Sequence, residues 1–367
     1  MSQVLIRGAG LFGLSTAIEL LRRGHRVTVV EPGPVPSPRA ASNDLNKVVR
    51  SEYAGDRQYT EMALAAIDGW TRWNDTFGEA VYEQAGVLLL TGDAAGFEAD
   101  SARLAGELGR PIETLSAGDV ANRFPAWASA GLGGYFNPRG GYCRSGLAVE
   151  CLARRVRQLG GTVGVREPGN VDLTIITAGV WTGELLPELA ALLRPTAHPI
   201  LYLRPRDPAA FEPPQWPVFT FDITRTGWYG FPVDAATGLV KLALHDAGDV
   251  VPPGVDRNAV DPRRLDQLRH FLDENVPALE NATLERAAVC CYTDTPDGHF
   301  LIDRLAGRPD TIVATGGSGH AAKMAPVLGP MVADLVEGKA NPWLARFALR
   351  SAGPSGFADS ARAAGRA

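Results

Sequence analysis

The stretch Val4-Leu5-Ile6-Arg7-Gly8-Ala9-Gly10-Leu11-Phe12-Gly13 decides the fold of this 367-residue chain. Its short apolar run is typical of a buried parallel strand, and its glycines follow the spacing G-x-G-x-x-G. Apolar residues then recur at helical spacing over residues 14–21, and Gly24 ends that helix. A second strand over residues 27–30 leads to Glu31. Strand, glycine turn, helix and strand in this order predict a dinucleotide-binding βαβ unit.

Each glycine of this unit has a separate role. Gly8 allows the tight turn, Gly10 lets the backbone approach a pyrophosphate, and Gly13 lets the helix pack closely on the strand. The helix N-terminus stabilises the phosphate charge. Glu31 can bind ribose hydroxyls, which favours FAD or NAD over NADP but does not separate the first two. The cofactor-binding residues predicted in this unit are Gly8, Gly10, Leu11, Phe12, Gly13 and Glu31.

Composition narrows the class of protein. Lys and Arg total 36 and Asp and Glu total 41, so the formal net charge is −5 and no nucleic-acid surface is indicated. No apolar run approaches the ~20 residues of a membrane helix, and no secretory signal precedes the first strand. Four cysteines do not indicate a disulfide scaffold. No His or Cys pair has zinc spacing, so no metal site is predicted. We expect a cytoplasmic protein without nucleic-acid or membrane partners.

The pattern of elements predicts an α/β (α+β) fold with two interleaved domains. Residues 198–248 contain several aromatic-rich strands between Gly and Pro turns, which is typical of an antiparallel sheet. Nucleotide-binding segments lie at the start, middle and end of the chain. We therefore predict a Rossmann-like nucleotide-binding domain from residues 1–85, 140–185 and 290–345. A substrate domain on a large mixed or antiparallel sheet takes residues 86–139 and 186–289, and residues 350–367 are expected to be a disordered tail.

Two later stretches are chemically specific. Val289-Cys290-Cys291-Tyr292-Thr293 places adjacent thiols in a strand, and Pro296-Asp297-Gly298-His299-Phe300 follows it. Gly316-Gly317-Ser318-Gly319-His320-Ala321-Ala322-Lys323 precedes a helix with one apolar face. The N-terminus of that helix can stabilise negative charge on a ligand.

Together these motifs resemble the D-amino-acid-oxidase superfamily, up to about residue 345. Within it they are most similar to monomeric sarcosine oxidase, N-methyltryptophan oxidase and the fructosyl amino acid oxidases. The resemblance implies a monomeric FAD-dependent oxidase. It would oxidise the C–N bond of a secondary, N-substituted or cyclic amino acid to an imine and reduce O2 to H2O2. Two alternatives stay open: a biosynthetic amine dehydrogenase or desaturase with poor O2 reactivity, and a flavin-binding module without catalysis.

The resemblance assigns further cofactor contacts. It implies an 8α-S-cysteinyl link between FAD and Cys290, while Cys291 stands where the family usually has an apolar residue. The alternative is that both thiols are small buried hydrophobes. The other cofactor-binding residues that the resemblance implies are Asn43, Lys47, Ala178, Gly179, Trp181, Gly317, Gly319, His320 and Lys323.

The substrate site is likewise implied by the resemblance. Arg50 and Lys323 would bind the substrate carboxylate, for which an Arg fork is suited; the alternative for Lys323 is an ordinary surface lysine. Asn43, Trp228 and Tyr292 would line the substrate cavity.

The segment Asp44-Leu45-Asn46-Lys47 resembles fructosyl amino acid oxidases more than sarcosine oxidases, which have a histidine and an arginine at the positions of Asn43 and Lys47. This departure allows a larger substituent on the substrate nitrogen. The alternative is that the segment is only a loop and helix cap.

Three residues are predicted to be catalytic. Lys241 and His245 are four apart in a strand, so they share a face, and the resemblance places Lys241 over the flavin, where its charge would favour electron transfer to O2. Lys47 is a competing candidate for the same role. The alternative for His245 is an ordinary polar residue at the end of a strand.

Overall fold

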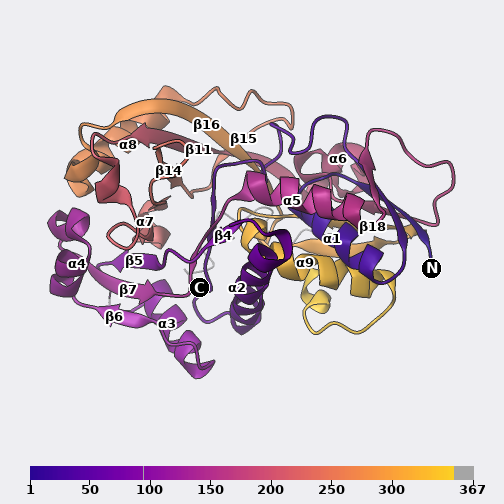
Figure 1. Ribbon diagram of the computed structural model, residues 1–367, viewed down its shortest axis with the longest axis horizontal. Helices are drawn as coiled ribbons and strands as arrows, with labels where there is room; N and C mark the ends of the chain where they lie inside the picture. The colour runs from indigo at the N-terminus through magenta and orange to yellow at the C-terminus, as the bar shows by residue number, and fades with distance from the viewer. Residues whose placement is uncertain (94, 351–367) are drawn as a thin grey trace.

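The computed structural model describes residues 1–93 and 95–350, and its two main sheets lie beside each other along the long axis of the molecule (Figure 1). The predicted tail at 350–367 lies, except for Arg350, outside the described residues. Within the described ranges, no helix is long and apolar enough to cross a membrane.

The smaller of the two main sheets contains the N-terminal strand β1. Its strand order is β17 (Leu301–Leu305), β18 (Arg308–Thr315), β10 (Leu173–Ile176), β1 (Gln3–Arg7), β2 (Arg26–Val30) and β9 (Thr162–Gly164). All neighbours are parallel except the β17–β18 pair. Val4, Leu5 and Ile6 of β1 are buried because helices cover both faces of a parallel sheet.

Helices pack closely against this sheet and one another. α1 (Leu11–Arg22) contacts both α5 (Ser145–Gln158) and α9 (Ala321–Val336), and α2 (Arg57–Phe77) contacts α9. Glycine makes these approaches possible: a Cβ on Gly329 would come within 2.4 Å of the Ser15 carbonyl oxygen, and one on Gly69 within 2.4 Å of the Pro326 ring. The C-terminal helix is thereby fixed beside the N-terminal one (Figure 1).

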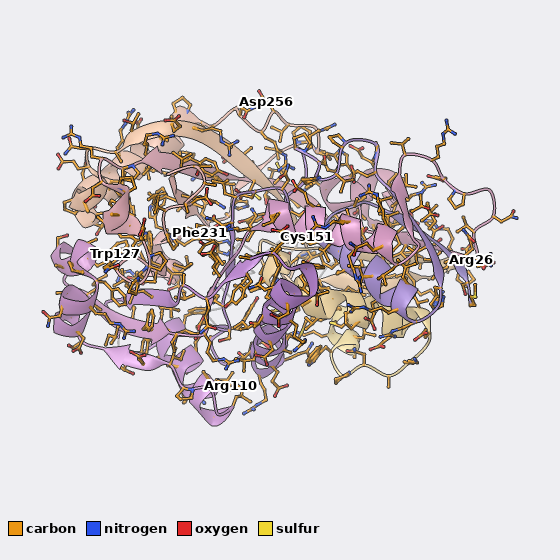
Figure 2. The ribbon with its side chains drawn as sticks, viewed as in Figure 1. Arg26, Arg110, Trp127, Cys151, Phe231 and Asp256 are labelled. Carbon is orange, nitrogen blue, oxygen red and sulfur yellow. The ribbon has the colours of Figure 1, made fainter. Side chains whose placement is uncertain are left out.

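The larger sheet has nine strands and is mainly antiparallel. Its order is β15 (Asp249–Val250), β11 (Arg194–Arg204), β14 (Val240–Leu244), β13 (Trp228–Gly230), β12 (Val218–Phe221), β5 (Val87–Thr91), β7 (Gly133–Asn137) and β6 (Glu113–Leu115), and β16 (Thr283–Asp294) also pairs with β11. Only the β5–β12 pair is parallel. Trp127 and Phe231 are buried against this sheet (Figure 2).

A small third sheet connects the two main ones. It consists of β3 (Lys47–Val49), β8 (Gly141–Cys143) and β4 (Tyr82–Glu83). The remaining helices are α3 (Phe97–Glu107), α4 (Ala117–Arg123), α6 (Thr182–Leu185), α7 (Ile223–Thr226) and α8 (Pro262–Asn275).

The predicted strands β1 and β2 and the predicted helix α1 are present in the structure. Sequence patterns did not reveal β3, β4, β6, β7 or β8, which have two to five residues and are stabilised by pairing with distant strands. Residues 44–46 form a loop, as the alternative for this segment has it, but Lys47 begins a strand and not a helix. Lys323 lies in the first turn of α9 and not before it. The predicted domain boundary at residue 290 falls inside β16, which runs unbroken to Asp294.

Candidate active site

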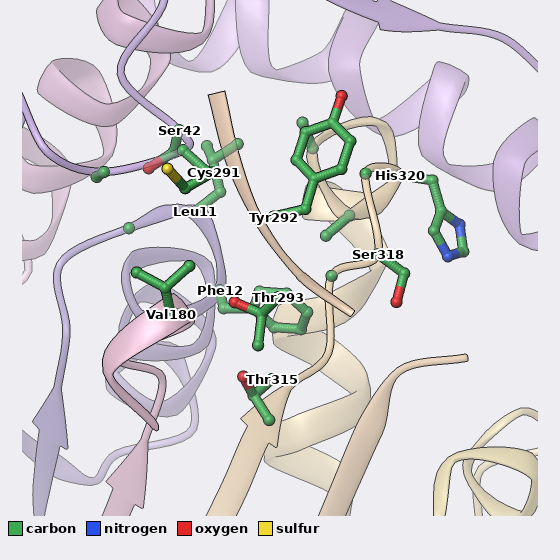
Figure 3. A pocket seen from close by; sticks show the side chains of 18 of the residues that line it. Leu11, Phe12, Ser42, Val180, Cys291, Tyr292, Thr293, Thr315, Ser318 and His320 are labelled. Atoms are coloured by element: carbon green, nitrogen blue, oxygen red, sulfur yellow. The ribbon is translucent and has the colours of Figure 1, made fainter. Parts of the chain in front are cut away.

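A cavity of about 810 Å³ lies where the parallel sheet meets the large sheet (Figure 3). Its walls come from the turns that follow β1, β10 and β18 and from strands β12, β13 and β16. Ligands of open α/β sheets bind at this edge, beyond the carboxyl ends of the strands. The predicted site residues that line the cavity are Gly8, Gly10, Leu11, Phe12, Glu31, Lys47, Arg50, Ala178, Gly179, Trp181, His245, Cys290, Tyr292, Gly317, Gly319, His320 and Lys323.

The glycine turn after β1 has the geometry that a pyrophosphate needs. Gly8 has φ +115°, which favours glycine, and a Cβ on Gly13 would come within 2.0 Å of the Gly8 carbonyl oxygen. Gly10 is the N-cap of α1 and no side chain caps this end of the helix. Ser42 Oγ would lie 3.3 Å from a Cβ on Gly10. The first turn of α1 therefore presents its N–H groups to the cavity, as a bound phosphate requires.

Glu31 has a second task besides the one predicted. It lines the cavity at the end of β2, but its carboxylate also accepts a hydrogen bond from the backbone N–H of Ala9, at 3.0 Å. This contact fixes the glycine turn against the acid. The adjoining segment contributes Arg39, whose guanidinium carbon lies 5.0 Å from the centre of the Trp181 ring.

Four of the predicted site residues lie outside the cavity lining: Gly13, Asn43, Trp228 and Lys241. Gly13 acts through packing, as its predicted role requires. Asn43 faces the start of α5, since its Oδ1 would lie 3.1 Å from a Cβ on Gly146. Trp228 does not line the cavity; its ring stacks on Phe271 in the core of the large sheet, with centroids 4.9 Å apart.

Tyr229, the neighbour of Trp228, takes the place in the cavity wall that was predicted for Trp228. Tyr229 lines the cavity, because successive residues of a strand point to opposite faces. Tyr229 is hydrogen-bonded to Tyr292 across the cavity wall. Tyr292 in turn stacks on His198, with ring centroids 4.0 Å apart, and His245 lies beside this pair. His245 lies directly after the end of β14 (Val240–Leu244), as the alternative has it, and it also lines the cavity, so Lys241 and His245 do not lie together within one strand as predicted.

The two thiols occupy opposite faces of β16 and have different surroundings. Lys47 Nζ lies 3.2 Å from Cys290 Sγ, within hydrogen-bonding distance. Cys291 packs with Val180 and Ala197 and lies near the N-terminal end of α1 (Figure 3). Burial raises the pKa of the Cys291 thiol. Cys290 therefore has the surroundings better suited to a nucleophilic sulfur.

A buried acid lies between the two predicted catalytic lysines. Asp44 Oδ2 accepts hydrogen bonds from Lys47 Nζ at 2.8 Å and from Lys241 Nζ at 2.7 Å. Lys47 lines the cavity, whereas Lys241 does not and is 1% exposed. Lys241, which the resemblance places over the flavin, lies in β14 outside the cavity lining, with its nitrogen hydrogen-bonded to Asp44 and to the Asn46 carbonyl oxygen.

Arg50 and Lys323 bring two cations to one part of the cavity wall. The Lys323 ammonium lies 5.1 Å from the centre of the Tyr53 ring, and the Arg50 guanidinium carbon lies 5.7 Å from the same centre. Arg50 also donates to the carbonyl oxygen of Glu52. Within residues 1–93 and 95–350, neither cation forms an ion pair with an acid. Burial, and then repulsion by Arg50, lower the pKa of Lys323 well below its usual range. A bound anion would relieve both effects.

His320 completes this part of the wall as a neutral ring. Its Nε2 lies 3.0 Å from the Gly298 carbonyl oxygen and therefore carries the proton, which leaves Nδ1 to accept from the Tyr53 hydroxyl at 3.1 Å. Burial, and then the charge of Lys323, lower the pKa of His320 to about 3. The cationic groups facing an anion here are thus Arg50 and Lys323.

Sequence reasoning missed several residues that line the cavity. Tyr53 follows Arg50 by three positions and Ser42 lies opposite the glycine turn, but neither stands in a motif with a known chemical role. Arg257 reaches the wall from the loop before α8, where no sequence signal points to it. Only the tertiary structure brings these loops to the site.

Comparisons with known proteins agree with this geometry. Peroxisomal sarcosine oxidase of Mus musculus is 30% identical over 359 residues, which cover 90% of this chain and 91% of that protein. N-methyl-L-tryptophan oxidase of Yersinia pestis (strain Pestoides F) is 26% identical over 366 residues, covering 92% of this chain and 96% of that protein. These relatives are named oxidases, and nothing in the comparisons supports a dehydrogenase.

The fold has a close match among solved structures, and the family follows from the sequence. The crystal structure of the fructosamine oxidase Amadoriase II from Aspergillus fumigatus, in complex with FSA, superposes with a TM-score of 0.81 and 25% identity, covering 99% of this chain and 91% of that one. A family model described as FAD dependent oxidoreductase (DAO) matches residues 3–335. The chain therefore belongs to the FAD dependent oxidoreductase family, and FAD is its cofactor.

Proposed function

We propose that this protein is an oxidase of secondary amino acids. A secondary amine and O2 are converted to an imine and H2O2, and water then splits the imine into a primary amine and a carbonyl compound. The observation that supports this proposal most directly is the pair of cations, Arg50 and Lys323, at the cavity wall without an acid partner among the described residues. A buried lysine and a half-buried arginine of this kind are stabilised by a ligand carboxylate.

The names of the relatives support the same substrate class. The mouse protein is a sarcosine oxidase, the Yersinia protein an N-methyl-L-tryptophan oxidase and the Aspergillus protein a fructosamine oxidase. Sarcosine and N-methyltryptophan both carry a carboxylate and a secondary amine. A carboxylate held by Arg50 and Lys323 would set the orientation of such a substrate in the cavity.

The residues of this chain would divide the remaining tasks. FAD, when bound, supplies the two-electron chemistry that oxidises the C–N bond and reduces O2. Tyr229 and Tyr292 are the aromatic wall against which a substrate amine could pack. Lys47 presents an ammonium group to the cavity, and His245 contributes a polar ring close to Tyr292.

Cys290 is the proposed site of covalent attachment to FAD. Its sulfur lines the cavity, 3.2 Å from the Lys47 nitrogen. Attachment would replace the S–H bond of Cys290 and one C–H bond of the flavin 8α-methyl group by a C–S bond, and O2 would take up the two electrons and two protons that are released as H2O2.

We also propose a division of the chain into two working parts. The parallel sheet and its glycine turn would hold the nucleotide, while β12, β13, β14 and β16 would supply the substrate side. The boundaries at 85–86, 139–140 and 185–186 follow the alternation of these segments, and the last boundary follows Asp294, where β16 ends. A cytoplasmic monomer that releases H2O2 fits this arrangement.

Anaerobic substrate screening tests the proposal. Holoprotein is mixed with N-methyl, cyclic and fructosyl amino acids without O2, and the visible absorbance of the oxidised flavin is followed. We expect bleaching with one of these classes and peroxide formation when air is admitted. The matched control is the same amine without its carboxylate, which should bleach the flavin poorly. Equal bleaching with and without the carboxylate would contradict the roles of Arg50 and Lys323.

A further inference from the structure

One threonine in the cavity wall has a hydroxyl group without a hydrogen-bond partner in the protein. Thr220 lies in β12, lines the cavity and is 2% exposed. Its Oγ1 is buried and has no partner among the described residues. A buried hydroxyl group that forms no hydrogen bond costs free energy, so such groups are normally paired. The Thr220 hydroxyl is therefore available to a polar group of a bound ligand.

The strands around Thr220 direct its side chain to the cavity. Phe219 and Phe221, its neighbours in β12, pack in the core on the other face of the sheet. Across the sheet, Thr220 pairs with Leu89 of β5 on one side and with Tyr229 of β13 on the other. Paired residues of adjacent strands share a face, and successive residues of one strand alternate between faces. Thr220 therefore shares a face with Tyr229, which also lines the cavity.

An aromatic wall connects this threonine with the proposed carboxylate site. The Arg50 guanidinium carbon lies 5.3 Å from the centre of the Phe97 ring, and Phe97 lines the cavity. Phe97 and Tyr229 pack against the same buried cluster, which includes Leu89. A ligand whose carboxylate contacts Arg50 would therefore meet apolar carbon along Phe97 and Tyr229 before it reaches Thr220. This order of groups fits a short apolar chain that ends in a hydroxyl group.

We propose that Thr220 is a specificity-determining residue that binds a hydroxyl group on the substituent of the substrate nitrogen. The inference deepens the proposed oxidase function and rests on it for the kind of substrate. The nitrogen substituent is assigned because Tyr229, the proposed wall for the amine, is the direct cross-strand neighbour of Thr220. A threonine hydroxyl can both donate and accept a hydrogen bond, and so can the hydroxyl group that it would bind.

Ligands without a C–N bond test this contact in the FAD-loaded protein. In (2-hydroxyethoxy)acetate and propoxyacetate an ether oxygen stands in place of the substrate nitrogen, and the two acids differ only in a terminal hydroxyl or methyl group. Titration calorimetry measures their dissociation constants. The preference for the hydroxyl-bearing acid should fall about 2- to 10-fold from the wild type to Thr220→Val, which is the usual worth of one neutral hydrogen bond. An unchanged preference, or no binding of either acid to the wild type, would overturn the proposal.

Two further variants and a second pair of ligands serve as controls. Thr220→Ser keeps the hydroxyl group and should keep the preference of the wild type. Thr114 is an exposed threonine of the same sheet, in β6 and outside the cavity lining, so Thr114→Val should keep it too. If Thr114→Val loses the preference as fully as Thr220→Val, the proposal is overturned. In 2-methoxy-3-hydroxypropanoate and 2-methoxybutanoate the difference lies on the carbon next to the carboxylate. A preference confined to this second pair would overturn the assignment to the nitrogen substituent.

Thermal stability and turnover complete the test. Because the Thr220 hydroxyl has no protein partner to lose, ligand-free Thr220→Val should melt at or above the temperature of the wild type. A lower melting temperature would indicate a structural role for this hydroxyl and overturn the proposal. N-(2-hydroxyethyl)glycine and N-propylglycine are then mixed with the holoprotein. If neither amino acid reduces the flavin, the oxidase function fails, whereas binding of the ether acids still decides the role of Thr220.

Discussion

Replacing Lys323 by methionine should weaken substrate binding and stabilise the substrate-free protein. Methionine has nearly the same volume as the lysine stem, so packing against Tyr53 is kept. The charge-assisted contact with the substrate carboxylate is lost, which costs about 1.5–3 kcal/mol. At 1.4 kcal/mol per factor of ten, this corresponds to a KM raised about 10- to 150-fold. Arg50 remains as the second anchor, so binding is not abolished.

The same substitution, Lys323→Met, should stabilise the folded protein although it weakens substrate binding. Burial and the repulsion of Arg50 lower the pKa of Lys323 well below its usual range, so the folded protein holds this charge unfavourably. Because the unfolded chain binds the proton more tightly, the cost is largest below the folded pKa and disappears as pH rises towards the ordinary lysine value. Lys323→Met should therefore raise the melting temperature, most clearly at neutral and lower pH.

A simple carboxylate provides the sharpest assay. Acetate competes for the anion site without bringing an amine, so its inhibition constant reports on Lys323 and Arg50 alone. Acetate needs the protonated lysine, so in the wild type the constant should rise with pH, by up to about tenfold per unit above the folded pKa. In Lys323→Met this slope should vanish.

Lys339→Met is the matched control, because the Lys339 side chain is 61% exposed and, among the residues that the structure describes, its only ion pair is with Glu337. Its KM and acetate inhibition should equal those of the wild type. An unchanged KM in Lys323→Met, or a lower melting temperature, would refute the reasoning about the buried cation.

Three further outcomes follow from the site. Cys290→Ala should abolish flavin fluorescence in the protein band of a denaturing gel, whereas Cys291→Ala should keep it; the reverse pattern would exchange their roles. In Gly13→Ala the new Cβ would lie 2.0 Å from the backbone, so this variant should lose about 1–3 kcal/mol or more of folding stability and fail to retain FAD. FAD titration and thermal melting measure the two effects. Tyr229→Phe should change KM several-fold (about 1 kcal/mol), while Trp228→Phe should lower the melting temperature and leave KM unchanged. If only the Trp228 variant changed KM, the orientation assigned to strand β13 would be contradicted.

The nucleotide unit could be predicted because its structure is local. Gly8, Gly10 and Gly13 are required by backbone geometry within one turn, and the strand and helix around them have clear periodicities. Cofactor class and family could likewise be predicted from short motifs such as Gly317-Ser318-Gly319-His320.

The details of the wall could not be predicted, because they depend on pairing between distant segments. Trp228 and Tyr229 are adjacent in sequence, and a shift of one residue in a strand reverses which of them faces the cavity. Pairing of β12, β13 and β14 decides this, and it places Tyr229 at the cavity and Trp228 in the core.

The two lysines, Lys47 and Lys241, likewise show what the sequence could predict and what only the tertiary structure decided. From the sequence, the resemblance placed Lys241 over the flavin, and Lys47 was a competing candidate for the same task. Their contacts bring together β3, β14 and the loop that holds Asp44, across 197 positions of sequence between Asp44 and Lys241. The sequence by itself determined that this chain binds a dinucleotide, because glycines and apolar periodicity act over a few residues, and its family motifs implied that the dinucleotide is FAD. Only the tertiary structure decided which ammonium reaches the cavity, because burial and ion pairing depend on every element packed around the charge.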